Sequence, residues 1–147
     1  MITIRPILPS DYESWSTLYA NYALFYQVNQ TKEMRDKLWA WLHDANLEVN
    51  GLLAVTDGGI AVGLVHYRPF SRPLSASTGG FLDDLFVQPS ARGEEIGKLL
   101  ISAVIQIGKE RKWTVIRWIT AENNYRARGS YDKIATQTKW VTYDVSL

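Results

Sequence analysis

Two adjacent carboxylates, Asp83 and Asp84, stand inside an otherwise apolar segment at residues 81–87. A carboxylate whose pKa is raised by burial can take a proton from an ammonium group, directly or through a water molecule. Neighbouring side chains of a regular strand point to opposite faces, so we expect one carboxylate to reach a site and the other to be structural. The alternative is that both make only structural hydrogen bonds.

A turn with two glycines, Gly93 and Gly97, follows this segment and leads directly into an amphipathic helix. The first turn of a helix presents free backbone N–H groups and a partial positive charge, and Arg92 adds a cation beside it. Together these features suit a diphosphate. The spacing matches neither the G-x-x-x-x-G-K-S/T loop of ATPases nor a dinucleotide fingerprint. The alternative is that Gly93 only shapes the turn and Gly97 lets the helix pack closely.

The composition excludes several other kinds of chemistry. The 147 residues contain no cysteine, which excludes disulfides, cysteine nucleophiles and thiolate metal sites. His43 and His66 lack the spacing of metal ligands, so we expect no metal, and we expect His66 to be a strand residue rather than a base. The net charge of +1 gives no sign of a nucleic-acid or membrane partner. Without a signal-peptide core or a membrane-length apolar run, a cytoplasmic location is expected.

Hydrophobic periodicity predicts the elements that position these residues, within a single domain of residues 1–147. Strands are expected at residues 2–7, 52–56, 60–67, 81–87, 115–120 and 138–145. A first helix is expected after a cap at Ser10 or Asp11, where Glu13 would complete a capping box with Ser10. Further helices are expected at residues 31–45, 96–107 and 125–133. A hairpin turn is expected at 57–59 and a flexible loop at 68–77. This order predicts an α/β fold, a mixed sheet with helices on both faces.

Two groups of residues together form a recognisable pattern. Residues 82–89 (LDDLFVQP) are followed by Arg92-Gly93 and by residues 96–100 (IGKLL), and residues 121–127 (AENNYRA) precede Tyr131. The first group resembles the acetyl-CoA motif of the GCN5-related N-acetyltransferases, the GNAT superfamily. The second is similar to another motif of that family, in which a Tyr follows an Asn by seven residues. The acidic strand is most similar to that of the polyamine and histone-type acetyltransferases.

The resemblance implies a mostly antiparallel sheet, splayed between its strands at 81–87 and 115–120, that binds acetyl-CoA as a co-substrate. It assigns the pantetheine arm to the backbone of Leu85, Phe86 and Val87 and to the amide of Asn124. It assigns the diphosphate to the turn and the helix start, namely Arg92, Gly93, Glu94, Glu95, Ile96, Gly97 and Lys98. By the same resemblance Tyr131 contacts the cofactor and protonates the departing thiolate, and Asp83 is the base. Backbone N–H groups around Phe86 and Val87 are expected to polarise the thioester carbonyl.

The resemblance also places the first two helices beside the acceptor. Their aromatic stripe is expected to be mostly core and partly a wall of the acceptor cleft, where aromatic rings suit a protonated amine. The residues of this stripe are Trp15, Tyr19, Tyr22, Tyr26 and Trp41.

The implied function is transfer of an acetyl group from acetyl-CoA to a primary amine of a small molecule or peptide, directly within a ternary complex. No acyl-enzyme is expected, because cysteine is absent and no Ser-His-Asp arrangement is evident. A homodimer is a possible assembly. Glu95 stands where the family has its middle glycine, and its charge and that of Glu94 oppose a diphosphate. The alternatives are a non-catalytic CoA-binding or sensor module with a degenerate pyrophosphate loop, and transfer of a longer acyl group.

Overall fold

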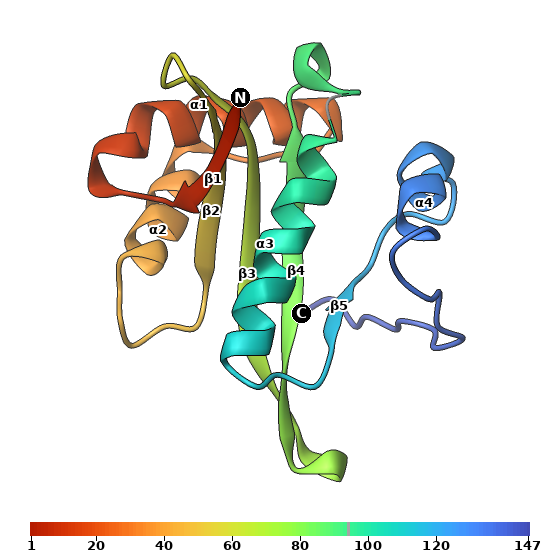
Figure 1. Cartoon of the computed structure of the whole chain (residues 1–147). Helices are drawn as coiled ribbons and strands as arrows, with labels where there is room; N and C mark the ends of the chain where they lie inside the picture. The colour runs from red at the N-terminus through yellow and green to blue at the C-terminus, as the bar shows by residue number, and fades with distance from the viewer. Residues whose placement is uncertain (94) are drawn as a thin grey trace.

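The computed structural model describes residues 1–93 and 95–147, and these form one five-stranded sheet in the order β1-β2-β3-β4-β5 (Figure 1). The first three pairings are antiparallel and the pairing of β4 with β5 is parallel. The predicted mixed, mostly antiparallel sheet is therefore confirmed. The strands are β1 (Ile2–Pro6), β2 (Asn50–Thr56), β3 (Ala61–Arg72), β4 (Ser77–Val87) and β5 (Ile116–Trp118).

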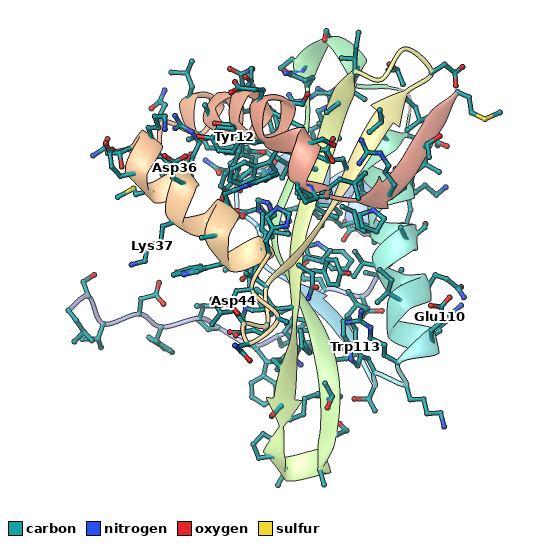
Figure 2. All side chains as sticks on the ribbon, turned by 90° about the vertical axis from the view of Figure 1, so that its left-hand side faces the viewer. Tyr12, Asp36, Lys37, Asp44, Glu110 and Trp113 are labelled. Carbon is teal, nitrogen blue, oxygen red and sulfur yellow. The ribbon has the colours of Figure 1, made fainter. Side chains whose placement is uncertain are left out.

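Helices cover both faces of this sheet, as predicted. Helices α1 (Tyr12–Phe25) and α2 (Lys32–Leu42) lie on one face, α3 (Ile96–Glu110) lies on the other, and α4 (Tyr125–Tyr131) follows β5 (Figure 1). Alternation along β2 explains the two layers, because Leu53 is buried against Trp15 of α1 while Leu52 is buried on the α3 side. The Tyr12 hydroxyl donates to Asp36 and ties α1 to α2 (Figure 2).

The feature that positions the site is a short β4–β5 pairing. Only Gly80, Phe81 and Leu82 of β4 pair with β5, opposite Ile116–Trp118, whereas β4 runs on to Val87 paired with β3 alone. The two strands therefore separate after Leu82. This gap is the splay that the resemblance implies, and it leaves the backbone edge of residues 83–87 free of β5.

Strands β3 and β4 extend far beyond their predicted bounds. Residues 68–77, predicted to be a flexible loop, instead form most of a long hairpin arm in which Arg72 pairs with Ser77 around a 3-10 turn at Pro73–Ser75. Gly79 and Gly80 lie within β4, where the aromatic rings of Phe70 and Trp113 occupy the space that a larger side chain would need. A Cβ there would lie 2.7 Å from Phe70 and 2.5 Å from Trp113 respectively. The prediction was wrong because local composition does not show which distant residues pair.

The start of α1 also differs from its prediction. The capping box of Ser10 or Asp11 with Glu13 does not form, and a 3-10 turn at Pro9–Asp11 precedes the helix. The Asp11 carboxylate instead accepts from the Leu8 N–H and the Arg5 guanidinium, each at 2.7 Å. This charged partner competes for the carboxylate that a cap needs. At α2, in contrast, the Thr31 hydroxyl does cap the helix.

The predicted final strand at 138–145 does not form in the single chain. Residues 138–147 have neither helix nor strand structure, although their side chains alternate as in a strand. A strand requires a partner edge, and alternation by itself does not say where that edge is. Among the described residues, no helix combines the length and apolar character that crossing a membrane requires.

Candidate active site

A cleft of about 540 Å³ opens where the splay, the start of α3, the end of α1 and α4 meet. The predicted cofactor residues that the structure describes all line it, while Glu94 lies outside the described residues. These lining residues are Leu85, Phe86, Val87, Arg92, Gly93, Glu95, Ile96, Gly97, Lys98, Asn124 and Tyr131. The fold therefore brings together two motifs that are more than 20 residues apart in the sequence.

The free edge of β4 presents the backbone of Leu85 and Val87. The Gln88 N–H donates to the Val62 carbonyl of β3 at 2.8 Å, so by strand alternation the Phe86 N–H also points toward β3. The N–H groups of Leu85 and Val87 point the opposite way, into the splay. We expected the backbone N–H groups around Phe86 and Val87 to polarise the thioester carbonyl. The alternation shows that the N–H groups available in the splay are those of Leu85 and Val87. Phe86 is instead a packing residue, buried against the Tyr22 ring.

The start of α3 offers three further backbone donors. The amides of Ile96, Gly97 and Lys98 belong to the first helical turn and have no acceptor within the helix. The first intrahelical bond is donated by Leu99 to the Glu95 carbonyl, at 3.0 Å. Free amides at the positive end of a 15-residue helix form a site for an anion.

The two glycines of the turn have different roles. Gly93 has a φ of +93°, so the turn itself requires a glycine there. At Gly97 a Cβ would meet only Val87 Cγ2, at 3.8 Å, which is an ordinary contact. Close helix packing therefore does not require Gly97, and the space beside its backbone belongs to the cleft. The alternative that Gly93 shapes the turn therefore holds, whereas the alternative that Gly97 lets the helix pack closely fails.

Arg92 connects the turn to α1. Its Nε donates to the Val87 carbonyl at 3.3 Å, and its guanidinium lies 4.4 Å from the centre of the Phe25 ring. The sequence prediction did not include Phe25, Arg126 or Lys133, which line the cleft. Tyr26, which was expected only as part of the aromatic stripe, lines it beside Phe25. Basic residues recur at 126–133 in the sequence, and this recurrence could have indicated Arg126 and Lys133 as cleft residues.

Tyr131 and Asn124 reach the cleft from the two ends of α4. The Tyr131 ring packs edge-on against Trp118 of β5, at a centroid distance of 5.3 Å. Burial raises the pKa of the Tyr131 hydroxyl, and Tyr26 nearby adds to the effect, so the phenol is protonated at neutral pH and can donate a proton. The Asn124 amide donates to the Thr120 hydroxyl at 3.1 Å, which orients it beside the cleft.

Asp84 belongs to a buried hydrogen-bonded chain. Its carboxylate accepts from the Tyr19 hydroxyl and lies against His66 Nδ1, each at 2.8 Å. The Trp15 indole can only donate, and its N–H points at His66 Nε2 at 3.0 Å. His66 therefore carries its proton on Nδ1 and donates it to Asp84. Burial opposes the charge of Asp84, but the bonds from His66 and Tyr19 outweigh it and lower the pKa of Asp84.

Asp83 is the extra residue of a β-bulge. In the register of β3 with β4, His66 pairs with Asp84 and Tyr67 with Leu82, so Asp83 has no opposite residue. Its carboxylate pairs with Arg68 Nε at 3.0 Å. Arg68 follows His66 by two residues on β3, so both face the α1–α2 side.

The expected opposite orientation of the two carboxylates is therefore wrong, because a bulge interrupts the alternation between Asp83 and Asp84. Their environments differ instead. Burial raises the pKa of Asp83, although Arg68 opposes the rise. The pKa values of the two neighbours are thus displaced in opposite directions.

Comparison with known proteins identifies the family to which this chain belongs. The model of the acetyltransferase (GNAT) family matches residues 15–135, so the chain belongs to that family. It is an acetyl-CoA-dependent N-acetyltransferase, the activity that the family and its curated relative support. That relative, the D-amino-acid N-acetyltransferase HPA3 of Saccharomyces cerevisiae, is 29% identical over 97% of this chain and 89% of its own length.

Solved structures agree on the fold. A ribosomal-protein-alanine N-acetyltransferase from Brucella melitensis superposes with a TM-score of 0.83 at 24% identity, over 100% of this chain and 99% of that one. AAC(6')-Iy, solved with the bisubstrate analogue CoA-S-monomethyl-acetylneamine, gives 0.82 at 19% identity over 100% and 99% of the two chains. These likenesses confirm the α/β acetyltransferase fold.

Proposed function

We propose that this N-acetyltransferase acetylates the primary amine of a small acceptor that also carries a carboxylate, with amino acids as the first candidates. The observation that carries the catalytic part is the splay, where the free N–H groups of Leu85 and Val87 lie in the same cleft as Tyr131. We propose the cytoplasm as the location of the reaction.

The described residues fit acetyl-CoA. The free amides of Ile96, Gly97 and Lys98 suit its diphosphate, and Gly97 leaves the space that a close backbone approach needs. The edge of β4 at Leu85 and Val87 suits the amides of the pantetheine arm, which can pair there as an added strand. When bound, acetyl-CoA supplies an activated acyl group.

Transfer needs three contributions from the protein. Attack by the amine nitrogen forms the C–N bond and breaks the C–S bond of the thioester. Asp83 takes one proton from the ammonium group, and the Tyr131 hydroxyl gives the proton that the departing sulfur needs. The second proton lost by the nitrogen restores the Tyr131 phenol. The N–H groups of Leu85 and Val87 stabilise the charge that develops on the carbonyl oxygen.

Asp83 is the better base of the two carboxylates. A base needs a free lone pair and a pKa closer to neutrality than that of an ordinary carboxylate. Asp84 Oδ2 is shared by two donors, which lower the pKa of Asp84. The pKa of Asp83 is raised, and among the described residues its ion-pair partner is the partly exposed Arg68.

One guanidinium supports an acceptor with a carboxylate. Arg68 lies beside Asp83, at 3.0 Å, and is stacked at 4.9 Å on the Phe81 ring. An ammonium near Asp83 and a carboxylate near Arg68 would match the two charges of an amino acid. The curated relative named above acts on D-amino acids, which is consistent with this acceptor class.

The test is thiol release from acetyl-CoA with D- and L-amino acids, polyamines, aminoglycosides and lysine peptides as acceptors. Replacing Arg68 with Gln should raise the KM for amino acids about tenfold or more, because a charge-assisted hydrogen bond contributes about 1.5–3 kcal/mol. Arg72→Gln, at the far end of the same strand, should change no acceptor constant. A preference for polyamines that Arg68→Gln leaves unchanged would contradict the amino-acid proposal.

A further inference from the structure

The α1–α2 face of the sheet continues onto the hairpin arm of β3 and β4. Helices α1 and α2 cover the upper part of this face, and the arm extends below both of them (Figure 2). Tyr67 and Leu82 belong to the core on the α3 side. By alternation their neighbours Arg68 and Phe81 lie on the α1–α2 face, and so does Phe70. None of these three side chains is buried, so this part of the face presents one cation and two aromatic rings.

Strand β5 adds a second cation to the same face. Ile116 packs into the core on the α3 side, so Arg117 points to the opposite face, that of α1 and α2. In the register of the sheet, Arg68 of β3 and Arg117 of β5 both stand opposite Phe81 of β4. The two arginines are therefore two strands apart, which is roughly 10 Å between their Cα atoms at the usual strand spacing.

Aromatic rings hold both guanidiniums in place. The Arg68 guanidinium lies 4.9 Å from the centre of the Phe81 ring, and that of Arg117 lies 5.4 Å from the centre of the Phe70 ring. The two rings contact each other edge to face, with their centres 6.2 Å apart. We refer to Arg68, Phe81, Phe70 and Arg117 as the arginine–aromatic row. A guanidinium stacked on a ring keeps its N–H groups available for a carboxylate.

The two cations of the row differ in what neutralises them. Arg68 pairs with Asp83 at 3.0 Å, whereas among the described residues no carboxylate lies within ion-pair distance of Arg117. Arg72, farther along the arm, donates to the Thr114 hydroxyl at 2.7 Å. Arg117 also borders a hollow of about 1260 Å³, through which a solute can approach it. Arg117 is thus a positioned guanidinium that can still bind an anion.

We propose that the arginine–aromatic row extends the acceptor site, and that Arg117 binds the side-chain carboxylate of an acidic amino acid. The inference rests on the proposed amino-acid acceptor. That proposal puts the amine at Asp83 and the α-carboxylate at Arg68, and a side chain that lies along the row from there ends at Arg117.

The length of glutamate suits this arrangement. Its two carboxyl carbons are four C–C bonds apart, which spans roughly 5 Å. A charge-assisted hydrogen bond to a guanidinium adds roughly 2.8 Å at each end. This reach is comparable with the separation of β3 from β5, so we expect glutamate as the preferred acceptor, ahead of aspartate, which is one bond shorter.

Glutamate and glutamine test the row as matched acceptors, because they have nearly the same shape and differ in the charge of the side chain. In the parent, the KM for glutamate should be at least about tenfold lower than that for glutamine, a ratio typical of one charge-assisted hydrogen bond. Arg117→Gln should remove this difference by raising the KM for glutamate. It should leave the KM for glutamine and the kcat for both acceptors unchanged.

Two further variants control this measurement. Arg117→Lys should restore part of the preference, because it keeps the charge and loses the two-pronged geometry. Arg72→Gln should change neither KM, because Arg72 already bonds to Thr114. A parent that acetylates both acceptors without distinguishing them, or a preference that Arg117→Gln leaves in place, would overturn the inference and leave the amino-acid proposal standing.

Inhibition by a dicarboxylate without an amine tests the row separately from the proposed function. Glutarate should compete with the acceptor at least about tenfold more strongly than pentanoate, which has the same length and one carboxylate. Arg117→Gln should abolish this advantage. The measurement can use any acceptor that the parent acetylates. Equal inhibition by the two acids would overturn the inference, whereas failure of every amino acid as an acceptor would overturn the proposed function and the substrate assigned here with it.

Discussion

The two sides of the splay are built in different ways. On the cofactor side, the groups that suit the diphosphate and the pantetheine arm are backbone amides from one continuous stretch, residues 85–98. On the α1–α2 side, the polar groups are side chains from three elements: Trp15 and Tyr19 on α1, His66 on β3 and Asp84 on β4. A backbone site tolerates changes of side chain, whereas a buried chain of side-chain hydrogen bonds does not, because each loss leaves its partner unsatisfied.

The largest effect is expected at Tyr131, which lines the cleft from the end of α4. Tyr131→Phe removes only the hydroxyl that we propose as the proton donor, so turnover should fall by about 10²-fold or more. The affinity for acetyl-CoA should be nearly unchanged, because the backbone amides hold the cofactor. Steady-state kinetics and a CoA titration check the two expectations. Unchanged turnover in a folded variant would remove Tyr131 from the mechanism.

Asp83 tests whether the acceptor side contains the base. Because burial raises the pKa of Asp83, turnover in the parent should rise with pH as this carboxylate loses its proton, at a pH above its ordinary value of 3.8. Asp83→Asn should lower turnover by up to about 10²-fold and abolish this rise. Measurements of turnover against pH for the parent, Asp83→Asn and Asp84→Asn check this expectation. If only Asp84→Asn abolished the rise, the two roles would be exchanged.

Asp84 tests the cost of disturbing the buried chain. Asp84→Asn should lower the free energy of unfolding by about 1.5–3 kcal/mol at neutral pH, because the bonds from His66 and Tyr19 lose a charged acceptor. The pKa of Asp84 is lowered in the fold, so its stabilisation is fully present above the ordinary value of 3.8. This stabilisation is lost as the pH falls below 3.8 and through the lowered pKa that Asp84 has in the folded protein.

Urea unfolding at a series of pH values should therefore show the gap between the parent and Asp84→Asn narrowing below pH 3.8. If the difference in unfolding free energy between the parent and Asp84→Asn stayed constant with pH, the charge of the Asp84 carboxylate would not stabilise the fold. Conservative replacement of the neighbouring Asp83 with Asn is the matched control, and it should show no such narrowing gap.

The smallest effect is expected at Glu95, on the backbone side. Its φ of +58° is one that glycine adopts readily and glutamate does not, which gives a physical reason for a glycine at this position. Glu95→Gly should tighten CoA binding roughly five- to tenfold, because one repulsive charge pair contributes about 1 kcal/mol in a solvated site. High salt should reduce the gain.

Calorimetric titration of CoA at low and high salt checks the prediction for Glu95. Glu95→Gln separates the two causes, because it removes the charge and keeps the strained backbone. A glycine in this left-handed position should also stabilise the unbound turn, by up to about 1 kcal/mol. Equal CoA affinities at both salts would mean that Glu95 does not act on the diphosphate.

Sequence by itself determined the cofactor half of this protein. The apolar strand, the glycine turn at Gly93 and the helix from Ile96 are contiguous, and their geometry follows from local rules for strands, turns and helix ends. The resemblance to the family motif could therefore assign residues 85–87 and 92–98 to the cofactor before any distant contact was known, and the cleft contains all of these that the structure describes. The mixed sheet with helices on both faces was predictable for the same reason.

Only the tertiary structure decided the features that depend on long-range pairing. The bulge that turns Asp83 and Asp84 toward one face is a property of the register between β3 and β4, which no local pattern contains. The tautomer of His66 depends on Trp15, 51 residues away. The hairpin arm replaced a predicted loop, and the strand predicted at 138–145 found no edge in its own chain. Alternation specifies the capacity to pair, whereas the partner is specified by the surface that the folded chain presents.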